Sequence, residues 1–313
     1  MARARLRLGL ALGGPSDATP WRPTIALATW ADRNGFDSVW LPEGHLRPGA
    51  TSAPLVALAA IAARTERVRL GTTSVLLSIH APARVAADVA TLDQLSGGRV
   101  VLGVGRGFEP ATFRAFGVDP RDKRDRFDDA LDAILATWRG ARDAGAGHLA
   151  SCPLQDPHPP IWVAAFGPKG LAQAARRGLP YLASPIESFE TLVANYARHA
   201  EALPAHVDRA TLAVPVMRTV HVAASDAEAR RVREAADAEF AVLASRARGA
   251  LAARVAGAAA DRTIVGTASA VLDQIAAYRE RIAIDHLIVR PAPRVPDAER
   301  RRSLEALAQL LLD

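Results

Sequence analysis

Short apolar segments alternate along the chain with longer segments whose apolar residues recur at helical spacing. The apolar segments predict strands at Leu6–Leu12, Phe36–Leu41, Val68–Leu77, Arg99–Val104, Ile161–Ala165, Leu179–Ala183, Leu212–Ala223 and Asp285–Val289. The periodic segments predict helices over Thr24–Asn34, Leu55–Arg64, Val85–Leu92, Phe127–Trp138, Pro168–Arg177 and Phe189–Ala202, then from Asp226, after a Thr267 cap, and over Leu304–Leu311. This alternation is typical of a parallel sheet, and its repetition favours a single (β/α)8 barrel domain over residues 1–313.

A doubly wound sheet is the competing architecture, and it would bind a dinucleotide through a glycine fingerprint. Gly9, Gly13 and Gly14 have the wrong spacing for that fingerprint. Gly103 and Gly105 fail because Phe108 replaces the third glycine. We therefore favour the barrel, with the polar, Phe-containing segment 108–123 as an insertion after strand four and residues 140–160 as a loop.

Composition excludes several functional classes. The 313 residues are 50% hydrophobic, which is enough for a large core, and the formal net charge is +6. The basic residues alternate with acids on helices and aromatics are only 5%, so we expect no nucleic-acid partner. Cys152 is the single cysteine, which excludes a disulfide within the chain. With no signal peptide or membrane-spanning segment in evidence, we expect a soluble, cytoplasmic protein.

The fourth predicted strand ends in a glycine-rich segment, residues 103–107, that contains one arginine, Arg106. Missing side chains let a ligand approach the backbone closely. A guanidinium can donate two parallel hydrogen bonds to a phosphate. The segment therefore suits a phosphate or a flat ring.

Residues 92–119 carry a resemblance to a known family. The matching positions are Leu92 to Ser96, Gly98-Arg99, Gly103, Arg106-Gly107, Phe113-Arg114, Phe116-Gly117 and Asp119. Together they resemble the bacterial luciferase α chain and the wider family of luciferase-like flavin-dependent monooxygenases. The similarity extends in ordered segments over about residues 5–190. It implies a flavin at the carboxyl ends of the strands, where barrel enzymes place their sites.

The resemblance implies cofactor contacts in the first half of the chain. Thr73 and Ser74 would be joined by a non-prolyl cis peptide against the flavin ring, although an ordinary Thr/Ser-rich strand explains them equally well from propensity. Gly105 would lie against the ring and Arg106 would bind the phosphate. The alternative for Arg106 is an ion pair with Glu109 or Asp88.

Further contacts are implied in the second half. Phe166, Gly167, Lys169 and Gly170 open a helix whose free N–H groups attract anions, and Ser184 matches a flavin contact. Gly-Pro-Lys also occurs in relatives that use the deazaflavin F420, which is the alternative cofactor. Arg218 and Arg290 would bind a substrate acid group or, as we expect, form ion pairs at the rim.

The catalytic candidate is His45, in the segment Glu43-Gly44-His45. Bacterial luciferase has Glu-His-His at this place, and the first histidine is the one implicated in catalysis. Here Gly44 stands at that position, which leaves His45 as acid or base. The alternative is a loop histidine that binds water. The eight histidines show no metal-ligand spacing, and neither a Gly-x-Ser-x-Gly elbow nor a nucleotide phosphate-binding loop occurs.

The resemblance implies a monooxygenase that takes reduced FMN from a separate flavin reductase and uses O2 to oxygenate a small organic substrate. Two alternatives remain open. One is an F420-dependent oxidoreductase that transfers hydride, and the other is a flavin-binding protein without catalysis, which Gly44 suggests. Relatives often form homodimers.

Overall fold

The computed structural model describes residues 5–13, 21–47, 49–143, 152–246 and 258–312. Positions 144–151 of the predicted loop lie outside these ranges. The chain divides into two compact units. Leu12–Arg33 and Asp37–Ala164 form the N-terminal unit, and Met1–Ala11, Asn34–Phe36 and Ala165–Asp313 form the C-terminal unit.

The strands of the N-terminal unit are parallel and buried. They are β2 (Ser38–Leu41), β3 (Arg69–Thr72), β4 (Val75–Leu76), β5 (Val100–Gly105) and β6 (Ile161–Ala164). Their order is β2-β3-β5-β6, and β4 also pairs with β5. Parallel strands that are buried on both faces are apolar throughout, as β5 is.

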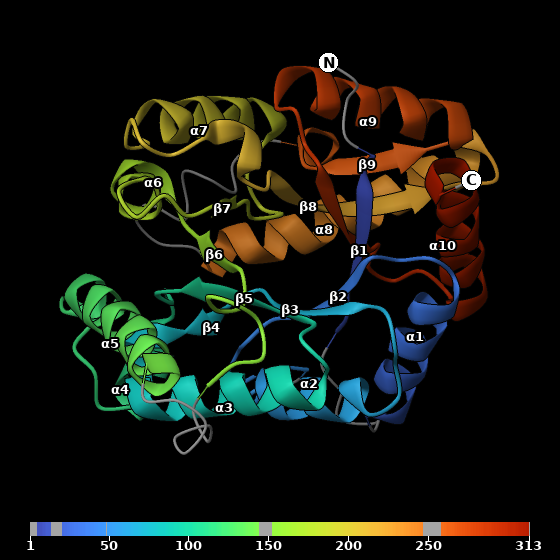
Figure 1. The fold of residues 1–313 in the computed structure, drawn as a ribbon. Helices are drawn as coiled ribbons and strands as arrows, with labels where there is room; N and C mark the ends of the chain where they lie inside the picture. The colour runs from blue at the N-terminus through green and yellow to red at the C-terminus, as the bar shows by residue number, and fades with distance from the viewer. Residues whose placement is uncertain (1–4, 14–20, 48, 144–151, 247–257, 313) are drawn as a thin grey trace. The chain divides into compact units, whose positions relative to one another are not determined.

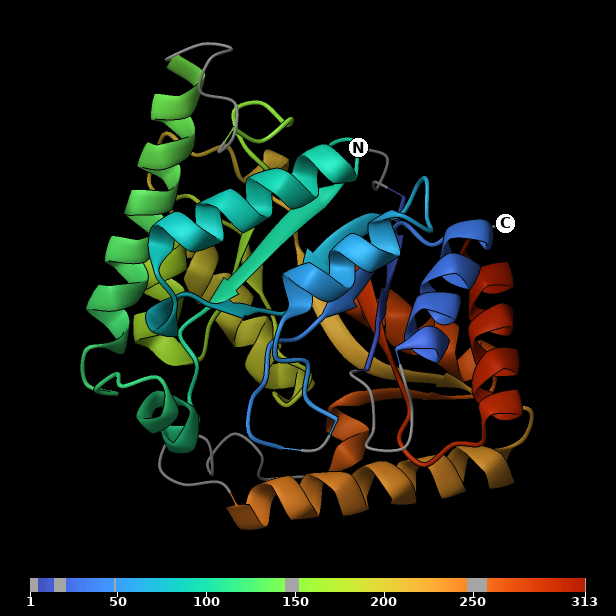
Figure 2. The ribbon, with the colours of Figure 1, turned by 90° about the horizontal axis from the view of Figure 1, so that it is seen from below.

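Helices cover the strands of this unit. They are α1 (Arg22–Arg33), α2 (Pro54–Ala62), α3 (Pro82–Leu95), α4 (Pro110–Ala115) and α5 (Lys123–Asp143). Figures 1 and 2 show α2 and α3 side by side along the strands, with α5 beside α3. Gly97 and Gly98 end α3 with φ angles of 67° and 80°, which glycine adopts readily.

Two predictions for this unit need correction. The third predicted strand, Val68–Leu77, is divided into β3 and β4 at a non-prolyl cis peptide between Thr73 and Ser74, the position that the family resemblance indicated. A 3-10 helix, Leu77–Ile79, follows β4. The segment after β5 was predicted to be irregular but contains α4, because Pro110 occupies the first helical turn, where its fixed φ and missing N–H cost nothing.

The C-terminal unit is also built from parallel strands. They are β1 (Arg7–Ala11), β7 (Tyr181–Leu182), β8 (Pro215–Val222), β9 (Thr263–Gly266) and β10 (His286–Pro291). The order is β1-β10-β8-β9, and Ala183, after β7, bridges to Val216 of β8. The helices are α6 (Gly167–Ala175), α7 (Phe189–Glu201), α8 (Asp226–Arg246), α9 (Ala268–Arg281) and α10 (Asp297–Leu312).

One strand of this unit was not predicted. Thr263–Gly266 forms β9, which pairs with β8 in the register Thr219↔Thr263. Four residues give too little alternation to recognise a strand. Thr267 occupies the predicted N-cap position of α9, but its side chain forms no capping hydrogen bond.

The other predicted elements are also present, and the one that differs most is α10, which begins at Asp297, well before Leu304. The chain therefore has an α/β fold in which parallel strands alternate with helices. No helix within the described ranges is both long enough and apolar enough to traverse a lipid bilayer.

Candidate functional site

A buried carboxylate and two histidines meet where β2 ends. Glu43 follows β2, and its side chain is 1% exposed. Its Oε1 lies 2.7 Å from Nε2 of His45 and 2.7 Å from Nε2 of His80, which follows the 3-10 helix after β4. Its Oε2 accepts a hydrogen bond of 2.8 Å from the Leu76 N–H. We name Glu43, His45 and His80 the carboxylate–histidine cluster.

The cluster holds Glu43 ionised. Burial raises the pKa of the Glu43 carboxyl, but the hydrogen bond and charge of His80, the Leu76 N–H and the hydrogen bond from His45 outweigh burial and lower it. An ionised carboxylate only accepts hydrogen bonds, so both histidines donate from Nε2. When either imidazole is neutral, this arrangement leaves Nδ1 as its proton acceptor.

His80 was missed in the sequence, and one signal would have found it. It follows the third predicted strand as Glu43 follows the second, and the carboxyl ends of neighbouring parallel strands lie at one edge of a sheet. His45, the catalytic candidate, has its ring bound to Glu43 through Nε2.

The phenylalanines after β5 have different environments. Phe113 is 1% exposed and packs with Ile79 and Val118, so it belongs to the core. The Phe116 ring meets the His45 ring edge-on at 4.8 Å between centroids and the His80 ring at 6.0 Å. Phe108 is 50% exposed. Phe108 is therefore the best placed of the three to form an apolar wall.

A cavity of about 50 Å³ adjoins the cluster. It is lined by Glu43, Gly44, Arg47, Leu76, Ile79, Gly107, Phe108, Glu109, Thr112 and Phe113. No group of three His, Cys, Asp or Glu side chains that could hold a metal ion is found among the described residues.

Gly105 and Ser74, both predicted flavin contacts, touch each other. A Cβ on Gly105 would lie within the van der Waals envelope of the Ser74 hydroxyl oxygen. Only glycine therefore fits at this place, and the end of β5 presents bare backbone. Thr72 fixes the neighbouring strand by donating from Oγ1 to the Gly103 carbonyl at 2.7 Å. A backbone wall with one hydroxyl fits a planar ring.

Arg106 lies among other positive charges. Burial, followed by the charges of Arg106 and Arg124, lowers the pKa of Lys123. Asp88, one alternative partner of Arg106, binds Arg84 at 2.9 Å. Lys123 was not predicted as a site residue, and together with Arg106 it makes this region attractive to an anion such as a phosphate.

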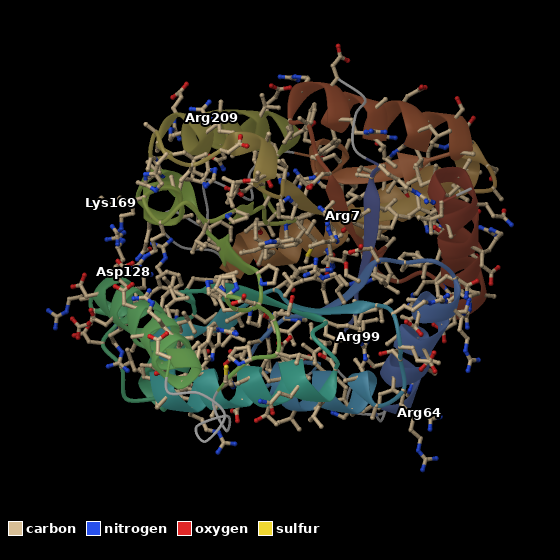
Figure 3. All side chains as sticks on the ribbon, viewed as in Figure 1. Arg7, Arg64, Arg99, Asp128, Lys169 and Arg209 are labelled. Atoms are coloured by element: carbon tan, nitrogen blue, oxygen red, sulfur yellow. The ribbon has the colours of Figure 1, made fainter. Side chains whose placement is uncertain are left out.

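In the C-terminal unit, the start of α6 also suits an anion. The helix begins at Gly167, whose φ is 67°, and Phe166 at the N-cap offers no side-chain hydrogen bond to the first N–H groups. Lys169 is exposed on α6, as Figure 3 shows, and Gly170 is buried. Ser184 lies in the loop after β7, where its carbonyl accepts a hydrogen bond of 3.0 Å from Arg218.

The two arginines expected at the rim differ. Arg290 pairs with Glu239, as predicted. The prediction for Arg218 was wrong, because this side chain is completely buried and donates to the Tyr278 hydroxyl at 2.6 Å and the Glu187 carbonyl at 2.9 Å. Its guanidinium fixes the loop that contains Ser184.

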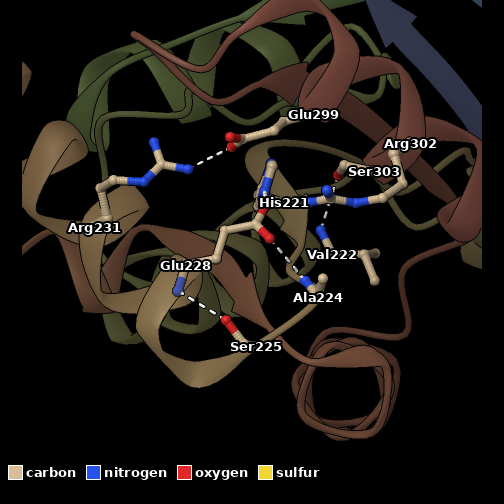
Figure 4. A network of polar contacts seen from close by, with 9 residues as sticks. All are labelled: His221, Val222, Ala224, Ser225, Glu228, Arg231, Glu299, Arg302 and Ser303. Carbon is tan, nitrogen blue, oxygen red and sulfur yellow. Dashed lines mark hydrogen bonds and ion pairs between the residues drawn. The ribbon is translucent and has the colours of Figure 1, made fainter.

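A second polar cluster, at the end of β8, was not predicted (Figure 4). His221, whose side chain is 2% exposed, lies 2.7 Å from Glu228 of α8, and Arg302 of α10 pairs with the same carboxylate. Burial raises the pKa of Glu228, but His221, the Ala224 N–H and Arg302 lower it below its usual value. The contacts of His221, Glu228 and Arg302 link β8, α8 and α10.

Comparison with known proteins places this geometry in a family. The profile of the luciferase-like monooxygenases matches residues 5–285. The oxygenase component of flavin-dependent trigonelline monooxygenase from Acinetobacter baylyi is 30% identical over 186 residues, which are 55% of this chain and 52% of that protein. The F420-dependent glucose-6-phosphate dehydrogenase of Beutenbergia cavernae is 36% identical over 191 residues, 54% of this chain and 55% of that protein.

Among solved structures, the monooxygenase RslO1 from Streptomyces bottropensis superposes with a TM-score of 0.82 and 27% identity over 98% of this chain and 99% of that one. The chain spans about half the length of the two relatives above. The family profile, in contrast, extends over almost the whole chain. This chain belongs to the luciferase-like monooxygenase family.

Proposed function

We propose that the protein is the oxygenating component of a two-component monooxygenase that uses reduced FMN and O2 to oxygenate a small organic substrate. The observation that carries this proposal is the bond between Glu43 and His45 beside the cavity. It gives the chain an oriented acid–base group although the family's histidine position is occupied by Gly44. A protein that only bound flavin would need no such group.

The N-terminal unit has residues that fit a flavin. The backbone wall of Gly105 with Thr73 and Ser74 suits the ring, and Arg106 suits the phosphate. The contacts predicted in the C-terminal unit, Phe166, Gly167, Lys169, Gly170 and Ser184, stay predictions. When bound, reduced flavin supplies the electrons that activate O2.

In the reaction, His45 would hold or move one proton at Nδ1. Its Nε2–H stays bonded to the Glu43 carboxylate, which orients the ring and stabilises the imidazolium. His80 shares that carboxylate oxygen with His45. Phe108 and the cavity wall would exclude water from the substrate.

We also propose the larger features that the family resemblance implies. These are closure of the strands into one (β/α)8 barrel domain, with residues 108–123 as an insertion after strand four, and delivery of reduced FMN by a separate reductase. The description of the A. baylyi relative as an oxygenase component supports the separate reductase. A homodimer and a cytoplasmic location stay predictions.

The cofactor is tested by anaerobic titration of the purified protein with reduced FMN and, separately, with reduced F420. We expect tighter binding of reduced FMN. A clear preference for F420 would instead make the protein a hydride-transferring oxidoreductase. The B. cavernae relative and the Gly-Pro-Lys start of α6 support that second candidate.

Catalysis is tested by admitting O2 to the reduced-FMN complex and following the flavin spectrum. We expect re-oxidation with a time course different from that of free flavin. His45→Ala should bind flavin normally but change this time course, and His206→Ala, in the C-terminal unit, serves as the control. Re-oxidation of the complex at the rate of free flavin would favour a protein that only binds flavin.

A further inference from the structure

The space beside Gly44 is occupied by the guanidinium of Arg47. A Cβ built on Gly44 would lie 3.0 Å from Nη2 and 3.4 Å from Nε of Arg47, and 3.5 Å from the Ala50 Cβ. The Gly44 N–H donates to the Thr51 carbonyl at 2.9 Å and closes the loop that carries Arg47. A side chain at position 44 would require the guanidinium to shift by a few tenths of an ångström, so glycine here leaves room for Arg47 beside the cavity.

No anionic partner of Arg47 is found among the described residues. Glu43 lines the same cavity, but its two oxygens accept hydrogen bonds from His45, His80 and the Leu76 N–H. Glu109 also lines it, with its carboxylate 3.5 Å from the Thr112 hydroxyl. Arg47 is thus a cation at a cavity whose buried carboxylate, Glu43, already accepts hydrogen bonds from other groups.

The remaining wall is mainly apolar. Leu76, Ile79, Phe108 and Phe113 supply it, and the half-exposed Phe108 extends it towards solvent. A volume of about 50 Å³ accommodates an acid group and the atoms next to it, and the rest of a ligand would lie along Phe108. Inorganic phosphate would gain nothing from the apolar wall, whereas an organic acid would use both features.

We infer that Arg47 binds the carboxylate or sulfonate of an organic acid and that this cavity selects anionic substrates with an apolar body. The inference deepens the proposed function. It rests on that function in one respect, which is that the bound organic acid is called a substrate. The binding site itself does not require the flavin. Arg47 is then a specificity-determining residue that sequence reasoning overlooked.

The test measures binding of benzoate, benzamide and inorganic phosphate to the flavin-free protein by calorimetry or ligand-observed NMR. We expect benzoate to bind about tenfold or more tightly than benzamide, which corresponds to a charge-assisted hydrogen bond. Phosphate should compete poorly. Equal binding of benzoate and benzamide would overturn the inference, and preferential binding of phosphate would overturn the assigned ligand class.

The matched variants are Arg47→Gln and Arg64→Gln, the second removing an exposed arginine after α2. Arg47→Gln should lose the benzoate preference, Arg64→Gln should retain it, and Gly44→Ala should weaken it by crowding the guanidinium. Thermal unfolding verifies that each variant is folded. Unchanged benzoate binding by Arg47→Gln would refute the assignment. Arg47→Gln should not change the affinity for reduced FMN. If the natural protein failed to bind reduced FMN, that result would count against the proposed function and not against the organic-acid site.

Discussion

Individual residues of the family motif mostly stabilise the fold. Arg99 donates to the carbonyls of Ala62, Thr65 and Val68, which form the end of α2 and the entry to β3. Asp93 is fully buried and accepts a hydrogen bond of 2.7 Å from the Gln155 side chain. Among the matching positions, Arg106 is the candidate for cofactor binding, and its neighbour Gly105 is the candidate contact of the flavin ring. The motif identifies the family so well because it specifies packing more than chemistry.

Replacing Arg99 with alanine should destabilise the protein by roughly 2–4 kcal/mol, because several carbonyls lose a charged donor in a partly buried place. Figure 3 shows Arg99 within the structure and Arg64 at its periphery. Arg64→Ala is therefore the control and should change stability by less than about 0.5 kcal/mol. Urea unfolding measures both, and similar losses would contradict the structural role of Arg99.

Glu43 should make stability depend on pH in the acid range. Its folded-state pKa is below its unfolded value of about 4.5, so its stabilising contribution is fully present above that value. The contribution is lost as pH falls through the folded-state pKa. Glu43→Gln should therefore flatten the decline of unfolding free energy below pH 4.5 relative to the natural protein. Parallel pH profiles of the two proteins would show that folding does not lower the pKa of Glu43.

At the scale of elements, the helices and long strands follow from periodicity, while the ends of strands do not. The division of the third strand at Thr73 and the convergence of His80 on Glu43 depend on contacts between residues far apart in sequence. Gly44 shows the same limit. The sequence shows that glycine replaces the family's histidine at position 44. That Arg47 lies beside this glycine is seen only in the structure. Sequence thus predicted that Glu43 and His45 follow a strand, but not how their side chains pair.

The contact between β5 and the segment after β3 gives an element-level prediction. Gly105→Ala should destabilise the protein by about 1–3 kcal/mol, because the new methyl group overlaps the Ser74 hydroxyl oxygen. Removing that oxygen with Ser74→Ala in the same chain should recover much of the loss. A double-mutant cycle measures the coupling. Additive effects of the two substitutions would show that the residues do not contact each other.

For the molecule as a whole, charge was the property that the sequence supplied most directly. The net charge is +6, and within the N-terminal unit Arg106 and Lys123 lie close enough for their charges to interact. A positive field attracts an anionic cofactor before any contact forms and raises its association rate. That field is screened by salt, since the Debye length falls to about 10 Å at 0.1 M.

The association rate of reduced FMN, measured anaerobically by stopped flow, should therefore fall about threefold or more between low and high ionic strength. Reduced riboflavin lacks the phosphate and should show a weaker dependence, which separates steering of the phosphate from other effects of salt. Arg106→Ala should act mainly on dissociation and weaken affinity by roughly 1.5–3 kcal/mol, because a short-range hydrogen bond is lost while most of the field remains. If FMN and riboflavin responded equally to salt, the phosphate would not be what the positive charge attracts.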